Sequence, residues 1–195
     1  YTPFSGAAAY YYGRTLRRSL THLKTEKDPM SGFEYKSVNT ELLGLVLERA
    51  TGTTVTQYLD EKIWKPLHME YDASWSIDKK NNGLEKTFCC INARARDFAK
   101  FGRLYLHDGN WNGVQVVPED WVKKCIAVND EPGGAWYYNR QWWIGPKEEG
   151  DFSAIGHLGQ YIYVYPKKNL VIVRLGTSRK KEEWISVLRQ VAHQL

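Results

Sequence analysis

The sequence is poor in cysteine and lacks metal-ligand patterns. Its 195 residues include three cysteines, of which Cys89 and Cys90 are adjacent and Cys125 stands apart. An odd count with two adjacent residues is not the pattern of a disulfide framework, and no histidine joins them at a zinc-ligand spacing. We therefore expect the three cysteines to be small buried apolar side chains, and we expect neither a metal nor another cofactor.

Long apolar runs and several enzyme signatures are also absent. The longest apolar run is far too short to span a bilayer, and no secretory signal peptide is present. No Gly-x-Ser-x-Gly nucleophile elbow, phosphate-binding loop or zinc motif appears. The chain starts at Tyr1-Thr2-Pro3, which reads as the middle of a protein, so the missing signal leaves the compartment open.

The charge does not indicate a nucleic-acid partner, and the aromatic content is typical of a wide cleft. The net charge is +5, but lysine and arginine are scattered, and the one dense run, Arg179–Lys181, is followed at once by two glutamates. We therefore expect no nucleic-acid partner. Aromatic residues make up 14% of the chain, with 8 Trp and 13 Tyr. Such rings are costly to expose and are useful in wide clefts.

The hydrophobic patterns predict helices first and an antiparallel sheet afterwards. Helical spacing predicts helices over Ala7–Leu23, Thr40–Ala50, Thr54–Trp64, Ala93–His107, Pro118–Val128 and Glu182–Leu195. Gly52 is a natural stop for the second of these, Thr54–Gln57 is a capping-box pattern that opens the third, and Asn92 is a candidate cap for the fourth. The stretches Lys24–Gly32 and Lys65–Gly83 read as loops. The runs Tyr161–Tyr165 and Leu170–Leu175 predict a hairpin with a four-residue turn, and the aromatic stretch Trp136–Ile144 alternates loosely. This order indicates an α+β protein.

Two short constellations are candidates for chemistry. Tyr35 stands just before an apolar helix, two residues ahead of Ser37, so its hydroxyl can be held at a site while it stays exposed. His157 lies between Gly156 and Gly159, directly before a strand. Glycines there let a ligand approach the backbone, and an N–H group there can serve as an oxyanion donor. Each signal is weak alone, because a tyrosine before a helix usually packs and a lone histidine is usually structural.

A serine nucleophile with a lysine one helical turn later, Ser-x-x-Lys, has two matches. Ser76–Lys79 lies in a polar loop, and Ser178–Lys181 follows a strand within a run of charges. The motif needs a serine at the N-terminus of a buried apolar helix. We therefore expect neither serine to be the nucleophile.

The order of these segments resembles a known family. Phe33–Gly52 reads Phe-x-Tyr-x-Ser-x-Asn-x-x-Leu-Leu-Gly-x-x-Leu-Glu-x-x-Thr-Gly, which resembles the second-motif segment of the β-lactamase-related serine hydrolases. This superfamily includes class C β-lactamases, penicillin-binding proteins and esterases. Similar segments follow in the same order at Trp64–Met69, Asp72–Trp75, Asn92–Gly102, Leu104–Gly109 and Trp111–Gly113. The resemblance covers nearly the whole chain and looks strongest to the branch with the 6-aminohexanoate-dimer hydrolases.

The resemblance implies roles for particular residues. Tyr35 would take the proton of a serine nucleophile and return it to the leaving group. Ser37 would stand where an asparagine often binds the site lysine or the substrate. Gly156–Gly159 resembles the third motif, usually Lys-Thr-Gly or His-Thr-Gly, so His157 would replace its lysine. The N–H of Gln160 would form half of an oxyanion hole.

Three further residues are expected to contact the substrate. Gly159 would keep the strand edge open, with Tyr161 and Trp143 beside it. The substrate would be a small ester, amide or β-lactam-like molecule. Because a neutral imidazole attracts a carboxylate less than an ammonium does, His157 favours esters or amides over β-lactams.

The resemblance also implies an incomplete chain. The family has an antiparallel sheet flanked by helices and a mostly helical subdomain. Here residues of about 7–128 would give the helical part, and residues 136–195 would give three strands and the terminal helix. The serine and lysine of the nucleophile motif should lie well upstream of Tyr35. We therefore expect a C-terminal part that is inactive alone and is completed by a missing N-terminal part or by a second copy.

Two other functions stay open. A non-catalytic penicillin-fold relative would bind or sense a ligand, with Trp136–Trp143 as its surface. An unrelated basic interaction protein would bind a polyanion in a salt-dependent way. The resemblance slightly favours a periplasmic or secreted bacterial protein, but the sequence does not fix the compartment.

Overall fold

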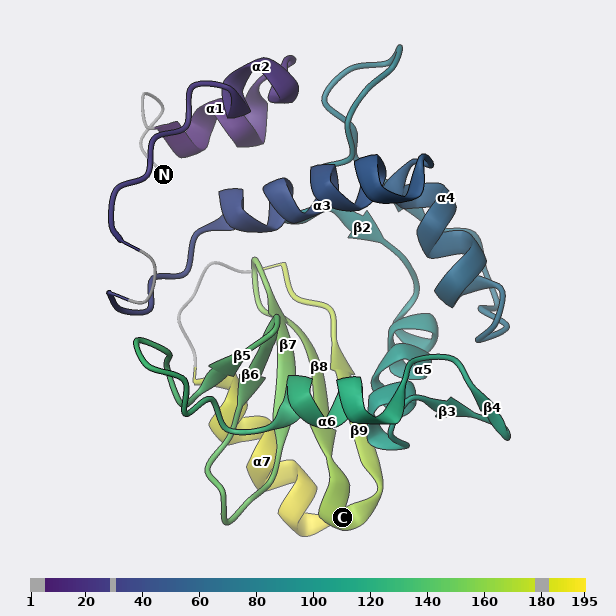
Figure 1. Ribbon diagram of the computed structural model, residues 1–195. Coiled ribbons are helices and arrows are strands. Elements are labelled where there is room, and N and C mark those ends of the chain that lie inside the picture. Colours follow the sequence, from purple (N-terminus) through teal and green to yellow (C-terminus); the bar gives the residue numbers. More distant parts are fainter. Residues whose placement is uncertain (1–5, 29–30, 178–182) are drawn as a thin grey trace. The chain divides into compact units, whose positions relative to one another are not determined.

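The computed structural model describes residues 6–28, 31–177 and 183–195, and it divides into two compact units (Figure 1). The first unit runs to Trp64 and also includes Ala73–Asn92. The second unit contains Lys65–Asp72 and Ala93–Leu195. The fold is of the predicted α+β class, but residues 93–128, predicted to belong with the helical part, group with the sheet.

The first unit is mostly helical. Its helices are α1 (Gly6–Tyr12), α2 (Leu16–Leu20), α3 (Ser37–Thr51), α4 (Val55–Leu59) and a π-helical turn, η1 (Asp60–Trp64). Two short strands, β1 (Ser74–Trp75) and β2 (Ile91–Asn92), pair antiparallel. Its apolar core is small: Leu16, Leu20 and Leu84 are buried, with Leu45 of α3 packed against them.

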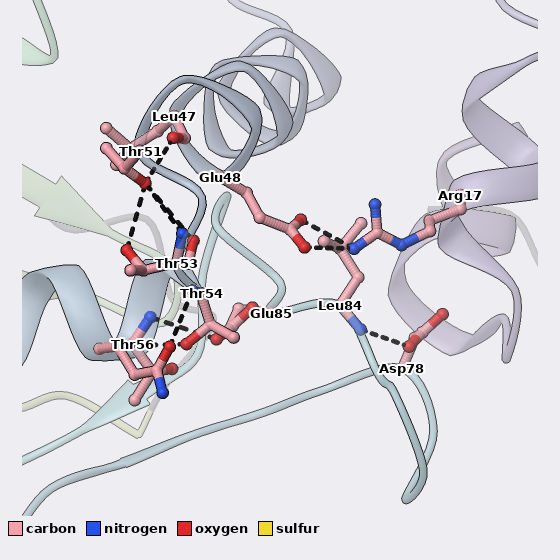
Figure 2. Close-up of polar contacts among 11 residues, drawn as sticks. Arg17, Leu47, Glu48, Thr51, Thr53, Thr54, Thr56, Asp78, Leu84 and Glu85 are labelled. Carbon is pink, nitrogen blue, oxygen red and sulfur yellow. Dashed lines mark hydrogen bonds and ion pairs between the residues drawn. The ribbon is translucent and has the colours of Figure 1, made fainter.

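Carboxylates from distant loops supply much of the order in this unit. Asp78 accepts hydrogen bonds from the backbone N–H groups of Leu16 at 2.9 Å and Leu84 at 2.8 Å. Figure 2 shows the Leu84 contact and the bond from the Thr56 N–H to Glu85, at 3.2 Å. Asp78 also explains why the helix predicted over 7–23 is broken. The chain bends between α1 and α2 so that the first amide of α2 reaches this buried carboxylate.

Local signals predicted α3 and α4 well. α3 ends at Gly52, which adopts a left-handed conformation with φ of 70°. Thr54 and Gln57 form the predicted capping box at α4, with both reciprocal bonds at 3.1 Å. The structure differs at the other end of α3, which starts at Ser37 rather than Thr40, and the helix after α4 continues as the π-helical turn.

The second unit is a five-stranded antiparallel sheet between helices. Its strands β5 (Tyr138–Asn139), β6 (Trp142–Ile144), β7 (Phe152–Gly156), β8 (Gln160–Tyr165) and β9 (Leu170–Arg174) lie in chain order (Figure 1). Its helices are α5 (Ala95–Leu106), α6 (Glu119–Ile126), α7 (Trp184–Gln194) and the 3-10 turn η2 (Pro166–Lys168). A separate small hairpin pairs β3 (Asn110–Trp111) with β4 (Val114–Gln115).

The alternation of β8 shows how the layers form. Ile162 and Val164 belong to the apolar cluster that includes residues of α5 and α6. Tyr163 and Tyr165 belong to the cluster that includes Leu188 of α7. Because successive side chains of a strand point to opposite faces, one strand is buried on both sides, with α5 and α6 on one face of the sheet and α7 on the other. At Gly102 of α5 an added Cβ would lie 2.7 Å from Val171 and 2.8 Å from Ile162, so this glycine allows the close approach.

The sheet corrects several predictions. It has five strands where the sequence predicted three, because β7 was not recognised and Trp136–Ile144 holds two strands. The predicted loop Lys65–Gly83 contains β1. Asn92 lies in β2 rather than capping α5, whose N-cap is Arg94. Pro118 is the N-cap of α6 rather than its first residue. No helix in the described part of the chain is long and apolar enough to cross a membrane.

The cysteines also differ from the prediction. Cys89 and Cys90 form a disulfide with each other, and both are half-buried. Cys125 is a buried free thiol, as expected. Adjacency in the sequence does not indicate such a bond, because two neighbouring cysteines can form a disulfide only where the local backbone allows it. Here Cys90 has a φ of 77°, in the left-handed region that side chains rarely adopt.

α7 is anchored to the sheet by a buried ion pair. The Arg189 guanidinium of α7 donates two hydrogen bonds to Asp151, at 2.9 and 3.1 Å. The Tyr163 hydroxyl donates a third at 2.9 Å. Asp151 is 2% exposed, so its charge depends on these three donors.

The first prediction concerns this anchor. Asp151→Ala should lower the free energy of unfolding by about 3 kcal/mol, because it leaves a largely buried guanidinium and a buried hydroxyl without an acceptor. Urea unfolding followed by circular dichroism measures the change. Glu119→Ala is the control, since it removes an exposed ion pair with Lys123 on α6 and should cost much less, because exposed ion pairs contribute little to stability. Equal losses in the two variants would contradict the anchoring role.

Candidate active site

Tyr35 and Ser37 lie at the start of α3. Lys36 is the N-cap, with extended backbone and no side-chain capping bond, and Ser37 is the first helical residue. Tyr35 is 47% exposed. A helix N-terminus carries a partial positive charge, which favours a negatively charged group beside it. This end of α3 therefore carries an exposed tyrosine.

The lysine beside Tyr35 is engaged by carboxylates. The Lys36 ammonium bonds Glu26 and lies 3.5 Å from Glu34, and the bond to Glu26 raises the pKa of Lys36. Glu34 also pairs with Lys27 at 3.0 Å, and this partner lowers the pKa of the Glu34 carboxyl. The positive charge of Lys36 is thus largely balanced by its own neighbours. A cation able to lower the pKa of a tyrosine has to come from elsewhere.

Glu41, one turn after Ser37, is a buried carboxyl that the sequence analysis missed. It is 1% exposed, and its Oε2 lies 2.8 Å from the N–H of Thr87 and 2.9 Å from its hydroxyl. The same hydroxyl lies 3.0 Å from the Thr40 carbonyl. One hydroxyl proton serves only one of these acceptors, so a protonated Glu41 satisfies both contacts. Burial raises the pKa of Glu41, which agrees with that state.

His157 and its neighbours form the turn between β7 and β8. Gly156 and Gln160 are the last paired residues of the two strands. Leu158 and Gly159 have positive φ values of 63° and 81°, which close the turn. His157 is exposed. The turn therefore presents an imidazole to solvent at the end of two central strands.

Gly159 does not lie at an open strand edge. β8 pairs with β7 on one side and β9 on the other, and the Arg174 guanidinium donates a hydrogen bond to the Gly159 carbonyl. A Cβ added at Gly159 would lie 2.5 Å from Arg174 Nη1. The guanidinium also stacks on the Trp184 ring at 3.6 Å. The room that a glycine provides here is occupied by Arg174.

The side chain of Gln160 is bonded within the sheet. Its Nε2 donates to the Gly176 carbonyl at 2.5 Å, and its Oε1 accepts from the Gly176 N–H at 3.0 Å. This pair of bonds continues the ladder between β8 and β9 by one step. The side chain is therefore committed to structure, and only the backbone of Gln160 is a candidate for the predicted oxyanion contact.

The two predicted aromatic contacts have different surroundings. Tyr161 packs in the cluster between the sheet and α7, and burial raises its pKa. Trp143 is half-buried on β6 and stacks parallel to Tyr137, with ring centroids 6.2 Å apart. Trp136 continues this group edge-on to Tyr137 and is 52% exposed. Trp143 thus belongs to an exposed aromatic surface, whereas Tyr161 supports the core.

The Ser-x-x-Lys match that lies within the described residues does not give a helical nucleophile. Ser76 lies in a turn of backbone beside β1, donating its N–H to the Cys90 carbonyl at 3.2 Å, and Ser76–Lys79 is not helical. Ser178–Lys181 lies outside the described residues. Within the described ranges, no group of three or more metal-ligand side chains is placed to hold an ion.

A basic cavity lies along α5, away from the predicted residues. Its volume is about 370 Å³, and its lining includes Arg96, Lys100, Arg103 and His107 of one helix face. Glu70 balances part of this charge, lying 3.4 Å from both Arg96 and Lys100. None of the predicted site residues lines this cavity.

Comparisons with known proteins agree with the fold. A sequence model of the beta-lactamase family matches residues 1–195. The 6-aminohexanoate-dimer hydrolase of Paenarthrobacter ureafaciens is 33% identical over 157 residues, covering 74% of this chain and 39% of that protein. A structure from Bacillus anthracis, provisionally described as a 6-aminohexanoate-dimer hydrolase, has a TM-score of 0.79 and 29% identity, covering 92% of this chain and 47% of that one.

A more distant likeness concerns the fold alone. A beta-lactamase from Mycobacterium bovis has a TM-score of 0.66 at 16% identity, with 88% of this chain and 67% of that chain covered. The chain spans less than half the length of the two 6-aminohexanoate-dimer hydrolase relatives that it matches.

The second prediction tests the buried carboxyl. Because its pKa is raised above the ordinary 4.5, Glu41 contributes stability below that pH and loses it as the pH rises. Glu41→Gln keeps an oxygen acceptor for the Thr87 N–H but cannot ionise, so its free energy of unfolding should exceed that of the wild type increasingly toward neutral pH. Urea unfolding from pH 4.5 to about 8 measures this. Glu61→Gln, an exposed change in the same unit, is the control and should show the same pH dependence of the free energy of unfolding as the wild type. The same pH dependence in Glu41→Gln would contradict the raised pKa of Glu41.

Proposed function

The chain belongs to the beta-lactamase family, and we propose that it is part of a serine hydrolase that cleaves an ester or amide through an acyl-enzyme. The observation that carries the proposal is the position of Tyr35. It is an exposed tyrosine fixed at the start of a fifteen-residue helix, within the segment that resembles the second motif of the family. Its relatives named as 6-aminohexanoate-dimer hydrolases support hydrolysis as the reaction type.

The reaction would proceed in two displacements. The Tyr35 phenolate accepts the proton of a serine hydroxyl as that oxygen attacks the substrate carbonyl. The negative charge on the carbonyl oxygen is stabilised by backbone N–H groups, one of them at Gln160. The C–O or C–N bond then breaks, and Tyr35 returns the proton to the leaving alcohol or amine. Water attacks the acyl-enzyme in the same way and releases the acid and the free serine.

The serine and lysine of this mechanism are proposed to come from another segment. A free tyrosine has a pKa of about 10, so it needs a nearby cation to act as a base, and Lys36 is already paired. A lysine one helical turn after the serine would be that cation. β9 has a described neighbour only in β8, and its other edge is suited to a strand from an N-terminal part or a second copy. The 195-residue chain alone is therefore proposed to be inactive.

The substrate is proposed to be a small, weakly charged ester or amide. Ser37 would hydrogen-bond the lysine or the substrate at the start of α3. The exposed imidazole of His157 provides a hydrogen bond without a permanent charge. The aromatic surface around Trp143 offers apolar contact to the leaving group.

The third prediction tests Tyr35 in the protein that includes the upstream segment. Tyr35→Phe should lower kcat for a short p-nitrophenyl ester by at least about 100-fold, because a general base is lost. Steady-state kinetics measure the loss. Tyr12→Phe, another exposed tyrosine of the same unit, is the matched control and should keep wild-type kcat. Activity that persists in Tyr35→Phe would show that Tyr35 is not the base.

A non-catalytic ligand-binding domain is the alternative function, favoured by the exposed rings of Trp136 and Tyr137. Covalent labelling with a fluorophosphonate, read by intact mass, separates the two. The longer protein should be labelled if it is a serine hydrolase, whereas the 195-residue chain alone should not be. A longer protein that stays unlabelled but binds ligands at the aromatic surface would be the binding domain.

The fourth prediction concerns substrate preference. The longer protein should hydrolyse a short p-nitrophenyl ester with a higher kcat/KM than a nitrocefin-type β-lactam, because His157 lacks the fixed charge that a β-lactam carboxylate prefers. His157→Lys should narrow this difference by raising kcat/KM for the β-lactam. Faster turnover of the β-lactam by the wild type would contradict the assignment.

A further inference from the structure

The disulfide between Cys89 and Cys90 takes no part in the proposed hydrolysis. It lies in the first unit, between Thr87 and the start of β2 at Ile91. Both cysteines are half-buried rather than enclosed in the core. The remaining cysteine, Cys125, is buried in the second unit and belongs to its apolar core.

A bond between neighbours cannot work as an ordinary disulfide staple. Disulfides stabilise mainly by closing a loop in the unfolded chain, and the effect grows with the length of that loop. The sequence separation here is 1, so no loop is closed. What the bond does constrain is the backbone at Cys90, whose φ of 77° is costly for a residue other than glycine. With the bond open, the backbone is free to leave this conformation.

The segment around the disulfide is held by hydrogen bonds that depend on this backbone path. The Trp75 indole N–H lies 2.8 Å from the Cys89 carbonyl and 3.0 Å from that of Lys86. The N–H of Ser76 donates to the Cys90 carbonyl at 3.2 Å. A change of φ at Cys90 would turn both cysteine carbonyls away from these donors.

The same segment is clamped to α3. Thr87, two residues before the disulfide, donates its N–H to Glu41 of α3. At Gly44, one turn further along α3, an added Cβ would lie 2.5 Å from the Thr87 side chain, so helix and segment are in close contact. The start of α3 carries Ser37, next to Tyr35. Movement of this segment would therefore change its contacts with α3, the helix that positions the proposed base.

We propose that Cys89–Cys90 is a reversible thiol–disulfide exchange site, and that opening it loosens the hold of Thr87 on α3. A low-molecular-weight thiol is the reductant. Its thiolate attacks one sulfur, the S–S bond breaks, and a mixed disulfide and one cysteine thiol form. A second thiol displaces the first, leaving both cysteines reduced and the two small thiols joined as a disulfide. The protein gains two electrons and two protons.

The structural arm of the test needs no enzyme activity. Protein handled in air, then denatured and alkylated without reductant, should carry one adduct, at Cys125, and three after treatment with dithiothreitol. In the folded reduced chain, hydrogen exchange of the Thr87 and Ser76 amides should quicken by about three- to tenfold, the change expected for one weakened hydrogen bond. Amides in the middle of β8 should not change.

Two variants provide the controls. A Cys89→Ser/Cys90→Ser double variant should exchange at the rate of the reduced wild type and ignore dithiothreitol. Cys125→Ala should keep the full response. Three adducts without reductant would overturn the proposal, and so would a disulfide whose reduction leaves the Thr87 amide unchanged.

The consequence for catalysis rests on the proposed function. In the longer protein, reduction should lower kcat for the ester severalfold with little change in KM, and the double variant should show the lower kcat under all conditions. A redox-dependent exchange rate without any hydrolase activity would uphold the exchange site while refuting the hydrolase. Activity that is identical in both redox states would refute the coupling to α3.

Discussion

The second unit depends on the burial of β8 from both sides. Its isoleucine and valine side chains pack under α5 and α6, and its tyrosines pack under α7. A strand buried on both faces has its register fixed, because a slip of one residue would exchange the two sets of side chains. The turn at residues 156–160 inherits this order, since its two ends are the last pair of β7 and β8. A site at this turn would be rigid because the sheet behind it is.

The first unit is held in a different way. Its apolar core is small, and buried carboxyl groups from distant positions bond backbone N–H groups that have no helical partner. Asp78 binds the start of α2, Glu85 binds α4, and Glu41 binds the segment at Thr87. Hydrogen bonds to charged groups contribute more than neutral ones, but the cost of an unmet partner is also larger. The order of this unit therefore depends on buried carboxyl groups as well as on apolar packing.

This difference explains what the sequence could predict. The capping box at Thr54 and the stop at Gly52 depend on residues close in sequence, and both were predicted correctly. The break between α1 and α2 was missed because it depends on Asp78, which lies 62 residues from Leu16. β7 was missed because Phe152–Gly156 mixes small and polar residues with apolar ones, and its neighbours on both sides, rather than its own pattern, make it a strand.

The candidate site shows the same contrast between features set by nearby residues and features set by distant ones. The exposure of Tyr35 follows from its place before a helix, so a local pattern sufficed to predict it. The surroundings of Gly159 did not follow, because the guanidinium that fills its space comes from the far end of the next strand. The disulfide was missed for a third reason, since two adjacent cysteines bond only where the backbone takes an uncommon path.

These constraints give the two units different sensitivities. The turn that carries His157 is held by apolar packing and by backbone pairing, neither of which changes its charge with pH or with oxidation. The start of α3 is coupled through its own buried acid, Glu41, to a segment that contains a disulfide. In the proposed enzyme, the redox state of Cys89–Cys90 would therefore act on the start of α3, next to Tyr35. An enzyme built in this way would be regulated through the helix that positions its base rather than through its oxyanion contact.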